Sequence, residues 1–247
     1  MSNKAQYNKN LVCTIKELLI EQKVKAALQA VEINPINAII DNSDIFKERS
    51  NPIKLMEKVN KLKKDFNDDL KASELSIKVK KYWGITGVNL TVQFIDKPIQ
   101  PEELRNRILM YMNVWGRYGN INFKEVLSNG KVRVSLESKD ITTYVGTDIL
   151  QVSICEPTTC LGGINSTTSE VQVCSILLHV TGHLLGLNYK IPFLEKENAL
   201  NKNIEISKPN SILKNDDHYI INDRVSKMDR NFISKLYPKD FHPYYKK

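Results

Sequence analysis

The stretch that decides the fold is His179-Val180-Thr181-Gly182-His183-Leu184-Leu185-Gly186-Leu187-Asn188-Tyr189. On a helix, residues four apart lie on one face, so His179 and His183 can direct two imidazoles at one metal ion. A zinc hydrolase also needs a third ligand, an open position for water and a carboxylate that takes the proton of that water. In the H-E-x-x-H pattern this carboxylate follows the first histidine, and a glycine three residues after the second histidine turns the chain toward the third ligand. Gly186 stands at that turning position.

Outward from this stretch, the order of the predicted elements favours an α+β fold. Pro101 is expected at the start of a helix that runs to about Gly116. Ser169 is expected to cap the histidine helix, with Gln172 placed for a capping box. The turn signal Asn129-Gly130 is expected to join two short strands. Hydrophobic patterning predicts strands at 88–94, 122–123, 132–136 and 148–154, a Gly- and Thr-rich loop at 158–168 and a last helix at about 225–236.

The first 80 or so residues have a different texture, because they are low in glycine and carry helical stripes. Apolar residues follow a period close to 3.6 from Leu11 to Val31, and again from Leu55 to Phe66. We therefore expect two regions: an N-terminal helical region, 1–81, and a second domain, 82–247.

The segment from Tyr82 to Pro238 resembles a bacterial and fungal group of matrixin- or astacin-like peptidases within the metzincin zinc peptidases, whose signature is H-E-x-x-H-x-x-G-x-x-H. The similarity includes the histidine helix and, in the same order along the chain, Tyr82-Trp83-Gly84, 90–94, 104–109, Asn113-Val114-Trp115-Gly116, 132–134, 146–150, Pro157-Thr158, Met228-Asp229-Arg230 and Leu236-Tyr237-Pro238. This resemblance implies a metzincin-like domain in which a twisted mixed sheet carries the histidine helix beneath a cleft.

The departures from this family fall on the reacting positions. Val180 stands where the family has its general-base glutamate, and an isopropyl group accepts no proton. Tyr189 stands at the third-ligand position, where a phenol with an ordinary pKa near 10 is a poor zinc ligand. Leu213 stands at the methionine of the turn that passes beneath the metal in the family. The resemblance therefore implies a retained scaffold with a degenerate site.

Our first hypothesis is a non-catalytic metallopeptidase homologue that binds a protein or peptide, either in the inherited cleft or on the N-terminal helices. This hypothesis assigns no catalytic residue to the protein and requires no cofactor. Zinc binding through His179 and His183 is expected to be weak, because losing one of three ligands costs several kcal/mol of metal affinity. The simplest interpretation of Val180 is a core or pocket-wall residue, and two helix histidines without any metal remain an open alternative.

Two other functions stay open. A divergent zinc hydrolase would use His179 and His183 with a third ligand and a base that the spacing does not identify. Its candidates for these roles are Glu195, Asp216, Asp217 and His218. A structural or toxin-like component would use the metzincin-like part only as a scaffold.

The four cysteines form no C-x-x-C pair, which argues against a zinc knuckle. Cys155 and Cys160 are close enough to bridge in an oxidising compartment, but no spacing demands a bridge. Some metzincins keep a propeptide cysteine on the zinc, and Cys13 precedes the similar region. Its flanking residues lack that family's switch motif, so we do not assign Cys13 to the site.

Charge and hydropathy exclude several partners. The net charge is +8, but basic and acidic residues are interleaved, which is typical of solvated helix faces and argues against a nucleic-acid partner. No apolar run is long enough to span a bilayer. The N-terminus is too charged for a signal peptide, so we expect a cytoplasmic protein or a processed or non-classically secreted form. The sequence carries no signal for an oligomeric state.

Overall fold

The computed structural model describes residues 13–33, 81–187 except 85, and 224–239 except 226. In chain order, its elements are β1 (Cys13–Ile15), α1 (Ile20–Ile33), β2 (Val88–Phe94), α5 (Glu102–Met112), the 3-10 helix η3 (Asn113–Arg117), β3 (Ile121–Glu125), β4 (Val132–Ser135), β5 (Ile141–Thr143), the 3-10 helix η4 (Gly146–Gln151), β6 (Thr159–Leu161), α6 (Glu170–Leu184) and α8 (Lys227–Leu236).

One sheet organises the described chain, with the strand order β1-β5-β6-β4-β2-β3. Strand β5 runs antiparallel to β6, and every other neighbouring pair is parallel. The sheet is therefore mixed, as predicted, but mostly parallel. Such a sheet with helices packed against it is a mixed α/β arrangement, which differs from the predicted α+β pattern because most strand pairs are parallel.

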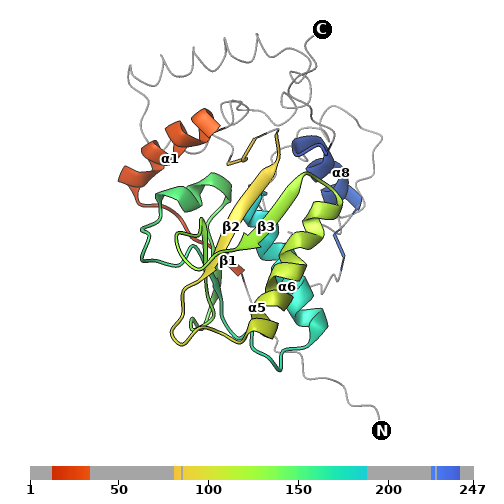
Figure 1. The fold of residues 1–247 in the computed structure, drawn as a ribbon. Helices are drawn as coiled ribbons and strands as arrows, with labels where there is room; N and C mark the ends of the chain where they lie inside the picture. The colour runs from red at the N-terminus through yellow and green to blue at the C-terminus, as the bar shows by residue number, and fades with distance from the viewer. Residues whose placement is uncertain (1–12, 34–80, 85, 188–223, 226, 240–247) are drawn as a thin grey trace.

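Helices α5 and α6 lie side by side and pack against the sheet (Figure 1). Strand β2 alternates buried and less buried residues, as expected for a half-buried strand. Helix α5 buries Leu104, Ile108 and Met112, the apolar face that its 3.6-residue period predicts. These residues join the strands and α6 in one main hydrophobic core. The histidine helix is thus held on a rigid, packed support.

The chain bends at Asn129, beside Gly130, but this bend does not make the predicted connection between paired strands. Strands β3 and β4 both pair in parallel with β2 and lie on opposite sides of it. Asn129 adopts a φ of 56°, and the amide of Gly130 donates to Oε1 of Gln93 at 3.1 Å. A Cβ atom on Gly130 would lie 2.5 Å from Cβ of Gln93. The bend therefore docks the connection closely against β2.

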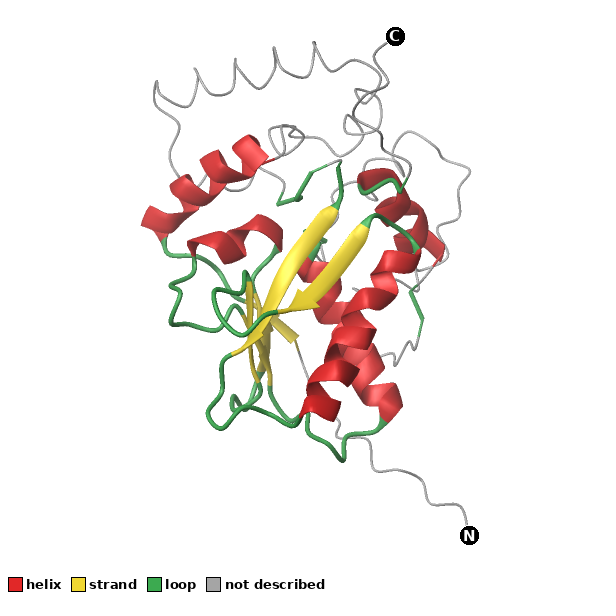
Figure 2. Cartoon of the chain, viewed as in Figure 1, coloured by secondary structure: helices red, strands yellow, loops and turns green. Residues whose placement is uncertain are grey.

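The strand predicted at 148–154 is wrong, because residues Gly146–Gln151 form the 3-10 helix η4. Within η4 the buried residues Gly146 and Ile149 are three apart, which matches the three residues per turn of a 3-10 helix. The Gly- and Thr-rich segment that was expected to be a loop supplies strand β6 instead. Figure 2 separates these short elements from the loops around them.

The described part of the N-terminal region, from residue 13, starts with a strand where a helix was predicted. Cys13–Ile15 forms β1, which pairs in parallel with β5, and helix α1 starts only at Ile20. A free sheet edge offers unpaired backbone groups to this β-branched stretch, and the tertiary pairing overrides the helical period. The second helical stripe, from Leu55 to Phe66, lies outside the described residues. The predicted domain boundary between residues 81 and 82 adjoins the undescribed residues 34–80, so this boundary stays a prediction.

Candidate metal centre

Helix α6 brings the two predicted imidazoles together. Nε2 of His179 lies 3.2 Å from Nε2 of His183, and the two rings meet at 85° with their centroids 4.8 Å apart. His179 is 8% exposed and His183 is fully buried. The four-residue spacing places both rings on one face of the helix, as any α-helix requires.

The surroundings of His183 hold its imidazole neutral. Nδ1 lies 2.8 Å from the carbonyl oxygen of Leu187, so in the neutral ring Nδ1–H donates to this carbonyl and Nε2 is left as an acceptor. Burial lowers the pKa of His183 to about 3, helped by the neighbouring charge of His179 and opposed by the Leu187 carbonyl. Neutral imidazole with a bare Nε2 is the form that binds a metal ion.

Cys13 lies beside this histidine pair. The ligand atoms of Cys13, His179 and His183 all lie within 4.8 Å of one another, and Cys13 is 4% exposed. Cys13 belongs to β1, so the strand that completes the sheet edge also delivers a thiol to α6. Sequence reasoning set Cys13 aside for want of a switch motif. The usable signal was the β-branched stretch Val12-Cys13-Thr14-Ile15, which favours a strand.

The position after His179 contributes no reactive group. Val180 is 1% exposed and is part of the main hydrophobic core. Within the described ranges, the group of three or more possible metal ligands is made of a thiol and two imidazoles, without a carboxylate. Tyr189, Leu213, Glu195, Asp216, Asp217 and His218 lie outside the described residues.

The chain turns sharply just past the second histidine. Gly186 adopts a φ of 89°, and the amide of Gly186 donates to the carbonyl of His183 at 2.8 Å. The amide of Leu187 donates to the carbonyl of Gly182 at 3.0 Å, so the backbone groups at the helix end are satisfied locally. This turn places the Leu187 carbonyl against the His183 ring.

Two aromatic side chains from distant segments fasten the same helix end. Nε1 of Trp83 donates to the carbonyl of Leu184 at 2.7 Å, and the hydroxyl of Tyr237 donates to the carbonyl of Leu185 at 2.7 Å. Burial raises the pKa of Tyr237 far above its ordinary value, so this donor keeps its proton. Both residues lie in segments that resemble the metzincins, but their positioning role was not predicted.

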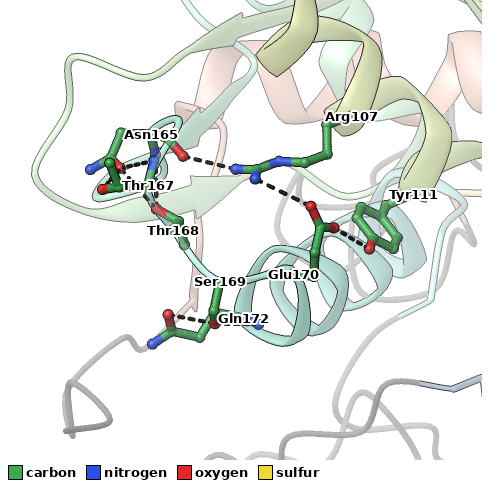
Figure 3. Close-up of polar contacts among 8 residues, drawn as sticks. All are labelled: Arg107, Tyr111, Asn165, Thr167, Thr168, Ser169, Glu170 and Gln172. Atoms are coloured by element: carbon green, nitrogen blue, oxygen red, sulfur yellow. Dashed lines mark hydrogen bonds and ion pairs between the residues drawn. The ribbon is translucent and has the colours of Figure 1, made fainter. Parts of the chain in front are cut away.

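The other end of α6 is tied to α5 through a polar cluster (Figure 3). Ser169 caps the helix, and its Oγ accepts a hydrogen bond from the amide of Gln172 at 3.4 Å. Glu170 pairs with Arg107 at 3.3 Å and accepts a hydrogen bond from the Tyr111 hydroxyl at 2.5 Å. An acidic residue in the first turn also suits the helix dipole. These contacts fix the long axis of the helix that carries the histidines.

The donor set fits a zinc ion. Zinc–nitrogen bonds of about 2.0–2.1 Å at a tetrahedral angle place two imidazole nitrogens about 3.3 Å apart, close to the observed 3.2 Å. His179 and His183 would hold the metal, which in peptidases of this kind polarises a bound water. That chemistry also needs a carboxylate to accept the proton of the water, and Val180 supplies no such acceptor.

Comparisons with known proteins support the fold. No family model and no curated protein matches this chain. Two solved structures of myroilysin, a metzincin-type metallopeptidase, are similar to it at 19% sequence identity. One match covers 65% of this chain and 83% of myroilysin with a TM-score of 0.52, and the other covers 64% and 86% with a TM-score of 0.51.

The described chain therefore has a fold similar to that of myroilysin. This likeness does not single out the matrixins or astacins, so that finer resemblance stays a prediction. In the described part of the chain, no helix is both long enough and apolar enough to cross a bilayer.

Proposed function

We propose that this chain is a metallopeptidase homologue that does not hydrolyse peptides and that acts by binding a protein or peptide partner. One observation carries the proposal: Val180, at the general-base position beside His179, is buried in the hydrophobic core. General-base catalysis typically contributes about 10²–10⁴-fold to a rate, and a valine supplies none of it.

The polar groups around the histidine pair support the same conclusion. His183 is fully buried, and a backbone carbonyl and a second imidazole face its two ring nitrogens. Catalytic zinc sites keep an open position for water, whereas these groups are enclosed. The thiol of Cys13 adds a ligand to this place but no base.

The strand arrangement supports the binding half of the proposal. Strand β5 would be a sheet edge without β1, and sheet edges accept extended peptides as added strands. In this chain the added strand is its own β1, so a peptide partner either displaces β1 or docks on another surface, such as the N-terminal helices.

The catalytic half of the proposal is tested with the full chain and a denatured protein mixture, with Zn²⁺ supplied and cleavage sites read by mass spectrometry. The expected result is no cleavage above that of a His183→Ala variant in chelator. Metal-dependent cleavage that His183→Ala abolishes would overturn the proposal and establish the alternative, a divergent zinc hydrolase. The retained imidazole spacing is the observation that favours this alternative.

The binding half is tested by selecting a random peptide display library on the immobilised full chain. Enrichment of related peptides that bind the chain in solution by fluorescence anisotropy is the expected result. A library that yields no related sequences counts against the binding function and favours a scaffold role.

A further inference from the structure

Strand β4 carries a buried arginine, Arg133, which is 5% exposed. A guanidinium has five N–H groups, and this one makes five hydrogen bonds to backbone carbonyls. The acceptors are the carbonyl oxygens of Glu156 at 2.7 Å, Val152 at 3.0 Å, Ser153 at 2.9 Å, Gly130 at 3.3 Å and Lys131 at 3.5 Å. The side chain therefore joins the connection before β4 to the segment 152–158, which connects η4 to β6.

The backbone of Arg133 binds the far end of the same segment. Its amide donates to Oγ1 of Thr158 at 2.8 Å, and the amide of Thr158 donates to the Arg133 carbonyl at 2.9 Å. Thr158 is 1% exposed, so this end is buried as well. Buried carbonyls need donors, and hydrogen bonds from a charged group are stronger than neutral ones. The segment 152–158 thus wraps around one residue and depends on it for its shape.

The first residue of this segment also receives helix α1. A small apolar cluster, apart from the main core, consists of Leu18, Ala26 and Val152. Next to it, Nε2 of Gln22 donates to the carbonyl of Gln151 at 3.1 Å. Val152 therefore has two partners: its carbonyl accepts from the guanidinium of Arg133, and its side chain packs against residues 18–33.

We propose that Arg133 positions the surface on which helix α1 docks, because its guanidinium fixes the backbone of Val152 and the Val152 side chain receives Leu18 and Ala26. The side-chain hydrogen bonds of Arg133 go to residues 130–156, so an effect on α1 passes through the segment 152–158. Without the guanidinium, buried carbonyls lose their donor and gain partners only by moving toward water, which takes Val152 away from α1. This inference does not depend on the proposed function, since it involves neither hydrolysis nor a partner.

The first test compares amide hydrogen exchange in the full-length wild type, Arg133→Ala and Arg133→Lys. We expect Arg133→Ala to raise exchange roughly tenfold or more both in residues 152–158 and in residues 18–33, while strand β2 stays protected. Arg133→Lys is expected to give a smaller rise, because an ammonium has three N–H groups and cannot span five carbonyls. The lysine variant decides the question if the alanine variant does not fold. Wild-type exchange of residues 18–33 in a folded variant would overturn the proposal.

Two further variants separate positioning from a general loss of stability. Val152→Ala removes the contact with α1 but keeps the carbonyl, so it is expected to raise exchange in residues 18–33 and to leave residues 153–158 protected. Arg105→Ala is the matched control, because Arg105 ties the Gln100 carbonyl and the Glu125 carboxylate to α5. It is expected to leave residues 18–33 at the wild-type rate. A rise there equal to that of Arg133→Ala would contradict the role of Arg133.

The last test is chemical rescue of Arg133→Ala. Ethylguanidinium, at a concentration that leaves the wild type folded, replaces the lost N–H donors and is expected to restore protection in residues 152–158 and 18–33 together. Tetramethylammonium at the same concentration carries the same charge without an N–H group and is expected to restore neither. Protection that returns with both cations, or with neither, would contradict the carbonyl-bound guanidinium as the positioning group.

Discussion

The indole Nε1 of Trp83 donates a 2.7 Å hydrogen bond to the carbonyl oxygen of Leu184, the residue after His183. The last carbonyls of a helix have no partner within the helix, so this bond satisfies a group that burial would otherwise leave unpaired. A tryptophan about 100 residues upstream thus fixes the end of the helix that presents the imidazoles.

Replacing Trp83 with phenylalanine removes this donor and keeps an aromatic ring. We expect Trp83→Phe to lower the free energy of unfolding by about 1–3 kcal/mol, the cost of leaving a buried carbonyl unpaired. Urea denaturation measures this change in the free energy of unfolding. The control Met110→Ala, at a residue 55% exposed, is expected to change stability by less than about 0.5 kcal/mol. Equal stabilities of the two variants would contradict this role for Trp83.

Gly186 allows the chain to turn against the segment that carries Trp83. A Cβ atom on Gly186 would lie 2.6 Å from Cδ1 of Tyr82 and 2.7 Å from the carbonyl oxygen of Lys81, and its φ of 89° disfavours any side chain. We expect Gly186→Ala to destabilise the fold by more than about 1 kcal/mol in thermal or urea unfolding. The control is Asn129→Gly. Asn129 is a non-glycine residue with a positive φ, so this variant is expected to be neutral or stabilising.

A glutamate at position 180 tests whether this position faces a working site. Because Val180 is 1% exposed among apolar neighbours, Val180→Glu buries a carboxylate and is expected to cost several kcal/mol. The matched variant Val180→Met tests the packing without the charge and is expected to cost less than about 1.5 kcal/mol. Urea denaturation compares them. A stable Val180→Glu that cleaves peptides would contradict the assignment of Val180 to the core.

The Tyr111 hydroxyl gives the α5–α6 contact a dependence on alkaline pH. Burial raises the pKa of Tyr111 to about 12, and the hydrogen bond and charge of Glu170 act in the same direction. Since an unfolded tyrosine ionises near 10, the stability from this group is present below about pH 10 and is lost as pH rises toward about 12. Wild type is expected to lose its advantage over Tyr111→Phe across this range in urea denaturation. A constant difference would contradict it.

Local patterning predicted the elements whose chemistry is contained in a short stretch of chain. The period-two alternation of residues 88–94 gave strand β2, and the Ser169 cap and the stop at Gly186 gave the bounds of α6 within two residues. The histidine spacing predicted that two imidazoles share a face, since this follows from helix geometry alone. The metallopeptidase-like fold was likewise expected from the sequence, and the myroilysin structures support it.

Long-range pairing decided what local patterning left ambiguous. Asn129-Gly130 signals a turn equally well between paired and unpaired strands, so only the sheet could reveal that β3 and β4 flank β2. Residues 148–154 were assigned to a strand because a short apolar run does not distinguish a strand from a 3-10 helix. For Val180, the sequence alone showed that the side chain accepts no proton. Its burial depends on tertiary packing, so only the structure could show it.

The sequence by itself determined that one helix carries two imidazoles, a valine beside the first and a glycine after the second, because these features depend on covalent order and helical period. Only the tertiary structure decided that Cys13 joins them. Its thiol is 166 positions from His179 along the chain (179 − 13 = 166), and their proximity arises from the pairing of β1 with β5, an edge contact that no local propensity encodes.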